Sequence, residues 1–129
     1  MTHRVTLTIT SLLSVLLFSL HWADEIRRGL EPGTVSSVGG FFILAVWLCA
    51  TLVIPGRTGL VILLLGSILA SGVPILHMQG VGLVGGRIAV NSSGALFWVW
   101  TNIALGASGM VTFVLAAVAL WNQRRVRQP

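Results

Sequence analysis

Charged side chains are scarce in this chain of 129 residues. Only 9% of the residues are charged, and they comprise three acidic residues and eight arginines. Soluble globular domains carry about a quarter charged residues, so these few cannot cover the surface of a water-soluble protein. The shortage therefore argues against a cytosolic enzyme. The length allows one domain, and we expect residues 1–129 to form a single transmembrane domain.

Cysteine is almost absent as well. The single cysteine, Cys49, lies within an apolar run, which excludes a disulfide framework and a metal site made of several cysteines. The sequence also offers no nucleophile next to a base, no P-loop and no pair of carboxylates typical of a hydrolase. An active site of its own is therefore not expected, although a redox subunit stays open.

Apolar residues are abundant, at 55% of the chain, and they come in long runs. A hydrocarbon core of roughly 30 Å is spanned by about 20 helical residues. Four runs approach this length: residues 5–23, 38–54, 60–77 and 95–121. They lack the alternation of barrel strands, so we expect helices. The predicted fold class is all-α, an integral membrane four-helix bundle of up-down-up-down order with outer loops 24–37 and 78–94.

The arginines predict the orientation and the partners. A net charge of +5 often indicates nucleic acid, but these arginines lie between or beside apolar runs, so lipid head groups are the expected partner and no nucleic acid is expected. Five lie on the side of both termini and three on the opposite side. The first set is Arg4, Arg57, Arg124, Arg125 and Arg127, and the second is Arg27, Arg28 and Arg87. Positive residues favour the cytoplasm, which predicts cytoplasmic termini and a cell membrane of the bacterial inner-membrane type.

Two groups of residues distinguish the helix faces. Polar residues of the first run share one stripe at about 100° per residue, and polar side chains avoid lipid, so this stripe should face the interior. Its members are Thr6, Thr10, Ser14, His21, Asp24 and Glu25. Small residues gather on the third and fourth runs, at Gly66, Ala70, Gly106 and Gly109. They are typical of close helix packing, or they leave a wall against which a flat ligand fits.

Two histidines point to a haem. His21 ends the first span and His77 ends the third, so both imidazoles should lie at a similar depth on diagonal helices of the bundle. Such a pair suits the two axial positions of a haem b iron. Arg27, Arg28 or Arg87 would then pair with the propionates. Residues 83–90, which we expect to form a hairpin over the outer mouth, would bring in Arg87.

The same end of the bundle also suits a bare transition-metal ion. His21 and Glu25 are four residues apart and thus share one helix face, Asp24 is adjacent, and His77 completes the set. Imidazole and carboxylate ligands suit zinc, iron, manganese or copper. His3 lies at the opposite end and cannot join them.

Interpretations without a cofactor also stay open. Histidines near span ends contact head groups, and Asp24 and Arg28 form an i,i+4 pair in a solvated charge cluster if the helix continues. A proton or ion path lacks an ionisable residue at mid-span. The sequence thus predicts a membrane protein that binds haem or a metal ion, and an electron-transfer or redox-associated subunit is one function that fits. The alternative is a non-catalytic accessory or transport-type protein that binds lipid, a small hydrophobic molecule, a partner subunit or its own copy.

Overall fold

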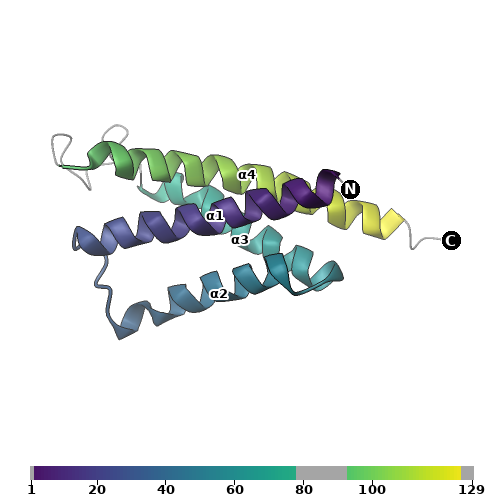
Figure 1. The fold of residues 1–129 in the computed structure, drawn as a ribbon, viewed down its shortest axis with the longest axis horizontal. Coiled ribbons are helices and arrows are strands. Elements are labelled where there is room, and N and C mark those ends of the chain that lie inside the picture. Colours follow the sequence, from purple (N-terminus) through teal and green to yellow (C-terminus); the bar gives the residue numbers. More distant parts are fainter. Residues whose placement is uncertain (1, 78–92, 126–129) are drawn as a thin grey trace.

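The computed structural model describes residues 2–77 and 93–125, and the regular secondary structure within these ranges is all helical. The helices are α1 (Thr2–Arg27), α2 (Val38–Leu52), α3 (Gly56–His77) and α4 (Ala95–Arg125), with a short 3-10 helix η1 (Val35–Ser37) before α2. Figure 1 shows the four long helices side by side, with consecutive helices running in opposite directions. The start of α1 and the end of α4 therefore lie at the same end of the bundle.

Three of the helices are long and apolar enough to cross a membrane, namely α1 from His3, α3 and α4. They indicate a multi-pass membrane protein. The predicted second span, residues 38–54, forms the shorter helix α2, which has 15 residues. At 1.5 Å per residue α2 measures about 22 Å, less than the roughly 30 Å of a hydrocarbon core. The expectation of four spans is thus supported for three helices.

The end of α1 differs from the predicted span end at residue 23. The helix continues to Arg27, so Asp24 and Glu25 lie on its last turn and not in an outer loop. It ends where Gly29 adopts φ +72. The amide of Leu30 donates to the carbonyl of Glu25 and that of Gly29 to Ile26, both at 3.0 Å. These two bonds form a Schellman motif, which needs a residue in the left-handed region.

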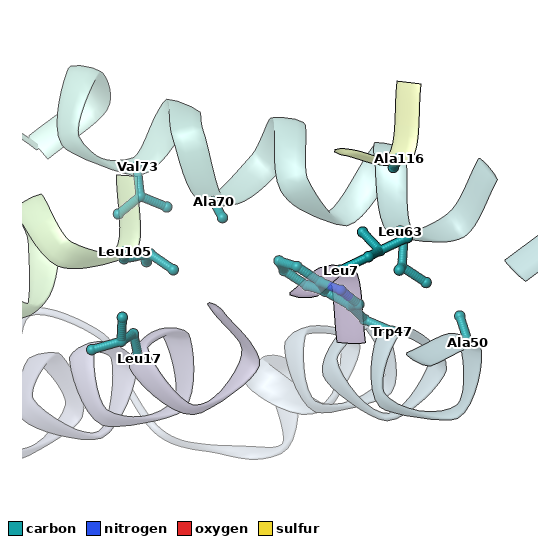
Figure 2. Close-up of a cluster of buried hydrophobic side chains, with 9 residues drawn as sticks. All are labelled: Leu7, Leu17, Trp47, Ala50, Leu63, Ala70, Val73, Leu105 and Ala116. Atoms are coloured by element: carbon teal, nitrogen blue, oxygen red, sulfur yellow. The ribbon is translucent and has the colours of Figure 1, made fainter. Parts of the chain in front are cut away.

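The core brings all four helices together (Figure 2). Its buried members are Leu7, Leu17, Trp47, Ala50, Leu63, Ala70, Val73, Leu105 and Ala116. Several small residues let bulky neighbours approach. A Cβ atom at Gly66 would lie 2.5 Å from Cδ2 of Trp47, and one at Gly106 would lie 2.5 Å from Cγ of Pro74.

The space beside the glycines of α3 and α4 is thus occupied by residues of the neighbouring helices. A Cβ atom at Gly109 would likewise lie 2.8 Å from the Cβ of Ala70. This confirms the prediction of close helix contact through small residues. The other interpretation, a side-chain-poor wall for a flat ligand, is wrong for these positions, because Trp47, Pro74 and Ala70 occupy the space.

Candidate metal centre

Three ligand-type side chains meet at the end of the bundle where α1 and α3 finish. His21 and Glu25 are one turn apart on α1 and both are buried, while His77 is the last residue of α3 and half-buried. Nε2 of His21 lies 3.1 Å from Nδ1 of His77. Oε1 of Glu25 lies 3.8 Å from the former nitrogen and 3.6 Å from the latter. We call these three residues the metal centre.

These three atoms have the spacing of ligands around one ion. The point equidistant from them lies about 2.0 Å from each, which is the usual length of a bond from zinc to an imidazole nitrogen or a carboxylate oxygen. Tetrahedral coordination at that length separates neighbouring ligand atoms by about 3.3 Å. The observed separations lie on both sides of that value, so the side chains need to move only slightly to bind.

The local structure explains why the ligands converge. His21 and Glu25 share a face because α1 stays helical past its apolar part. Pro74, one turn before His77, lies inside α3 and packs on Gly106 of α4. This contact holds the end of α3 against α4, which places His77 opposite the last turns of α1.

Thr101 of α4 determines which nitrogen of His21 is available. The Thr101 hydroxyl donates to the carbonyl of Trp98 at 3.1 Å, so its oxygen accepts a bond from Nδ1–H of His21, also at 3.1 Å. The proton on Nδ1 leaves the lone pair of Nε2 facing His77 and Glu25. Hydrogen bonds of this kind orient histidine ligands in metal sites.

The bond between the two imidazoles follows from this tautomer. Since Nε2 of His21 accepts, Nδ1–H of His77 is the donor across the 3.1 Å contact. A metal ion would replace that one proton and bind both nitrogens. Trp98, fully buried on α4, packs against both rings, with centroids 5.4 Å from His21 and 5.9 Å from His77.

Asp24, which the sequence also predicted as a ligand, pairs with two arginines. Its Oδ1 accepts bonds from Nε and Nη2 of Arg27, at 3.1 and 2.9 Å, and its Oδ2 accepts from Nε of Arg28 at 2.7 Å. The predicted Asp24–Arg28 pair is thus confirmed. Arg28 also donates to the carbonyl of Ser93 at 3.0 Å, which ties the end of α1 to the start of α4.

Two further sequence predictions concern Arg87 and haem. Arg87 and the hairpin predicted over residues 83–90 lie outside the described residues. The haem hypothesis is not supported by the geometry, because axial ligands on both sides of an iron stand about 4 Å apart with the porphyrin between them. Here the imidazoles of His21 and His77 bond each other directly and stack, with centroids 5.2 Å apart.

A second polar cluster lies deeper in the bundle and includes residues outside the predicted stripe. Nε1 of Trp47 donates to Ser11 at 2.9 Å, and Ser11 bonds Thr51 at 2.7 Å. Ser14 donates to Ser108 at 3.0 Å. Ser11 lies outside the predicted polar stripe because the buried face of α1 is rotated toward it and away from Thr6, which is exposed.

The structure also has a groove that the sequence did not indicate. It lies between α1 and α2, has a volume of about 250 Å³ and is almost entirely apolar. It is lined by Val15, Ser19, Trp22, Ala23, Ile26, Phe41, Leu44, Ala45 and Leu48. None of its lining residues belongs to the metal centre. The hydroxyl of Ser19 donates to the carbonyl of Val15 at 2.8 Å, so it offers the groove no hydrogen to donate.

Comparisons with known proteins do not assign the chain. A scan against protein-family models and searches of curated proteins and of solved structures found no match. The functional assignment therefore depends on the residues themselves. Three long apolar helices make this a multi-pass membrane protein, and the buried His21, Glu25 and His77 could hold a metal ion.

Proposed function

We propose that this protein binds one divalent transition-metal ion in the membrane, through His21, Glu25 and His77. The observation that carries the proposal is the triangle of ligand atoms, whose separations of 3.1, 3.6 and 3.8 Å lie within about 0.5 Å of those around a tetrahedral ion. Two imidazoles and one carboxylate form a ligand set typical of zinc, iron, manganese or copper. Zinc suits it best, because this ion accepts nitrogen and oxygen ligands at tetrahedral spacing.

The charges around the site support a cation there. Glu25 is buried at 4% exposure, and its Oε1 lies 3.8 Å from Nε2 of His21 and 3.6 Å from Nδ1 of His77. A divalent ion is attracted to a carboxylate beside two imidazole nitrogens, because these groups are typical ligands of transition metals.

The distribution of arginines supports the proposed location. Arg4, Arg57, Arg124 and Arg125 stand near the ends of α1, α3 and α4 that lie away from the metal centre. Because arginines are enriched on the cytoplasmic side of membrane proteins, both termini face the cytoplasm across a bacterial-type cell membrane. The metal centre then lies toward the outer side. A redox-active ion there would suit an electron-transfer or redox-associated subunit, whereas zinc would not transfer electrons.

Elemental analysis of the purified protein tests the proposal. We expect about one metal ion per chain, and we expect that His21→Ala and His77→Ala each lose most of it. His3→Ala is the matched control, because His3 is an exposed histidine at the other end of α1. Equal metal content in the wild type and both variants would overturn the proposal. If the wild type shows a Soret band that both variants lose, the bound group is haem and not a bare metal ion.

The apolar groove favours a second candidate function, an accessory protein that binds lipid. The surroundings of α1 and α2 in a membrane are acyl chains, and the apolar lining of the groove matches one such chain. Arg27, which is 65% exposed, follows Ile26 at the end of the groove. An exposed arginine there suits a lipid phosphate.

A further inference from the structure

Three buried polar atoms of α4 lack a hydrogen-bond partner among the described residues. They are Nε1 of Trp98 and both amide atoms, Nδ2 and Oδ1, of Asn102. Both side chains are 0% exposed. Buried polar atoms of folded proteins nearly always have a partner, and a membrane offers none from outside the protein. These atoms therefore indicate a ligand that is not part of the chain.

The position of Asn102 follows from its neighbours on α4. Trp98, one turn before it, packs on both imidazoles. Gly106, one turn after it, packs on Pro74 of α3. Asn102 thus lies in the interface of α3 and α4, one turn further into the bundle than the histidines, and residues four apart are about 5–6 Å from each other on a helix. A single small molecule bridges such a distance.

The metal centre itself requires a further ligand. His21, Glu25 and His77 supply three positions of a tetrahedron, and sites with three protein ligands keep the fourth for water or another exchangeable molecule. Helix α4 contributes no metal ligand to this group. It contributes the indole N–H of Trp98 and the amide of Asn102, which are hydrogen-bonding groups without a partner.

We propose that Trp98 and Asn102 hold a small exchangeable ligand in the fourth position of the metal ion. The ligand is water or hydroxide, and a small anion replaces it. A metal-bound water keeps one lone pair, which accepts from Nε1–H of Trp98, and it donates a hydrogen to Oδ1 of Asn102. The ligand enters past His77, whose side chain is 16% exposed. This inference depends on the proposed metal binding.

Cobalt-loaded protein and azide provide the test. Co²⁺ replaces zinc at nitrogen and oxygen ligands, and its visible absorption reports its coordination. We expect azide to change this spectrum in a saturable way. In Trp98→Phe and Asn102→Leu we expect cobalt content to stay the same and the affinity for azide to fall about tenfold, since each variant removes one hydrogen bond to the ligand.

Trp47→Phe is the matched control, because Trp47 is equally buried but donates to Ser11 in the deeper cluster. Its azide affinity should equal that of the wild type. Absence of cobalt bands from the wild type would overturn the metal proposal and this inference together. Cobalt bands that azide leaves unchanged would overturn the inference alone. Unchanged azide affinity in Trp98→Phe would overturn the role of Trp98. Because this variant keeps an aromatic ring in the core, it tests the inference even if Asn102→Leu fails to fold.

Discussion

Thr101 contributes a single hydroxyl to the metal centre, and this hydroxyl fixes the proton of His21. It accepts a hydrogen bond from Nδ1–H of His21 and donates one to the carbonyl of Trp98. Without this acceptor either nitrogen of His21 carries the proton, and one of the two tautomers blocks Nε2. In the proposed metal site, the threonine would therefore act on the ion through the histidine without touching it.

Thr101→Val tests this role, because valine keeps the shape and removes the hydroxyl. Loss of a partner that orients a histidine ligand lowers metal affinity by about 10–100-fold, and we expect this range for Zn²⁺ in a competition titration with a coloured chelator. Thr112→Val is the control, since Thr112 is equally buried on α4 but bonds Ser108. Equal Zn²⁺ affinities of wild type and Thr101→Val would contradict the role.

Residue spacing predicted part of this site and missed the rest. His21 and Glu25 follow from the i,i+4 rule, and His77 from equal depth at the span ends. The role of Asp24 does not follow, because spacing alone does not decide between a metal and the guanidinium groups of two following arginines. Thr101 lies across the bundle, and its contact depends on the rotation of α4 about its own axis.

At the scale of elements, the ends of helices differ most from the prediction. A span predicted from hydropathy ends at the first charge, whereas α1 continues because Asp24 pairs with Arg27 and Arg28 at i+3 and i+4 on its last turn. Helix α2 ends at Leu52, two residues before the end of its apolar run. Pro55 follows that run, and a proline disfavours helical backbone in the residue before it. The packing of α2 on α1 also leaves the apolar groove.

Filling this groove tests the proposed lipid site. Ala45→Phe adds a ring to the lining and should lower the amount of lipid that co-purifies with the protein, measured by native mass spectrometry in mild detergent. The ring occupies volume that an acyl chain would take, and both are apolar, so stability should change little. Ala107→Phe is the control, because Ala107 is exposed on α4. Equal lipid content in both variants would count against an acyl chain in the groove.

For the whole molecule, the large apolar side chains on the outside are the main feature. Residues such as Ile9, Leu65 and Val114 are half exposed or more, which suits a surface surrounded by lipid. Low charge and long apolar runs predicted this environment correctly. The apolar runs predicted four crossings, but α2 with its 15 residues is shorter than a span. Composition alone does not determine where such a helix ends or how it packs.

The number of crossings determines on which sides the two ends of the chain lie. Four crossings place the starts of α1 and α3 and the end of α4 on one side, which agrees with their common end of the bundle in Figure 1. Three crossings, without α2, would place the start of α1 and the end of α4 on opposite sides of the membrane. A thinner bilayer around a helix of about 22 Å costs only fractions of a kcal/mol per Å, so we predict that α2 crosses.

Single cysteines in a Cys49→Ala background, labelled with an impermeant maleimide in intact cells, test this prediction. We expect Glu31→Cys to react from outside, because Glu31 follows the outer end of α1. His3→Cys, Thr58→Cys and Asn122→Cys should react only after the membrane is opened, because the arginines near them favour the cytoplasm. Thr58, in the first turn of α3 shortly after the end of α2, is decisive. If Thr58→Cys reacts together with Glu31→Cys, α2 does not cross. The end of α3 at His77 would then lie on the side of the membrane opposite to His21, and this result would also contradict the proposed metal centre.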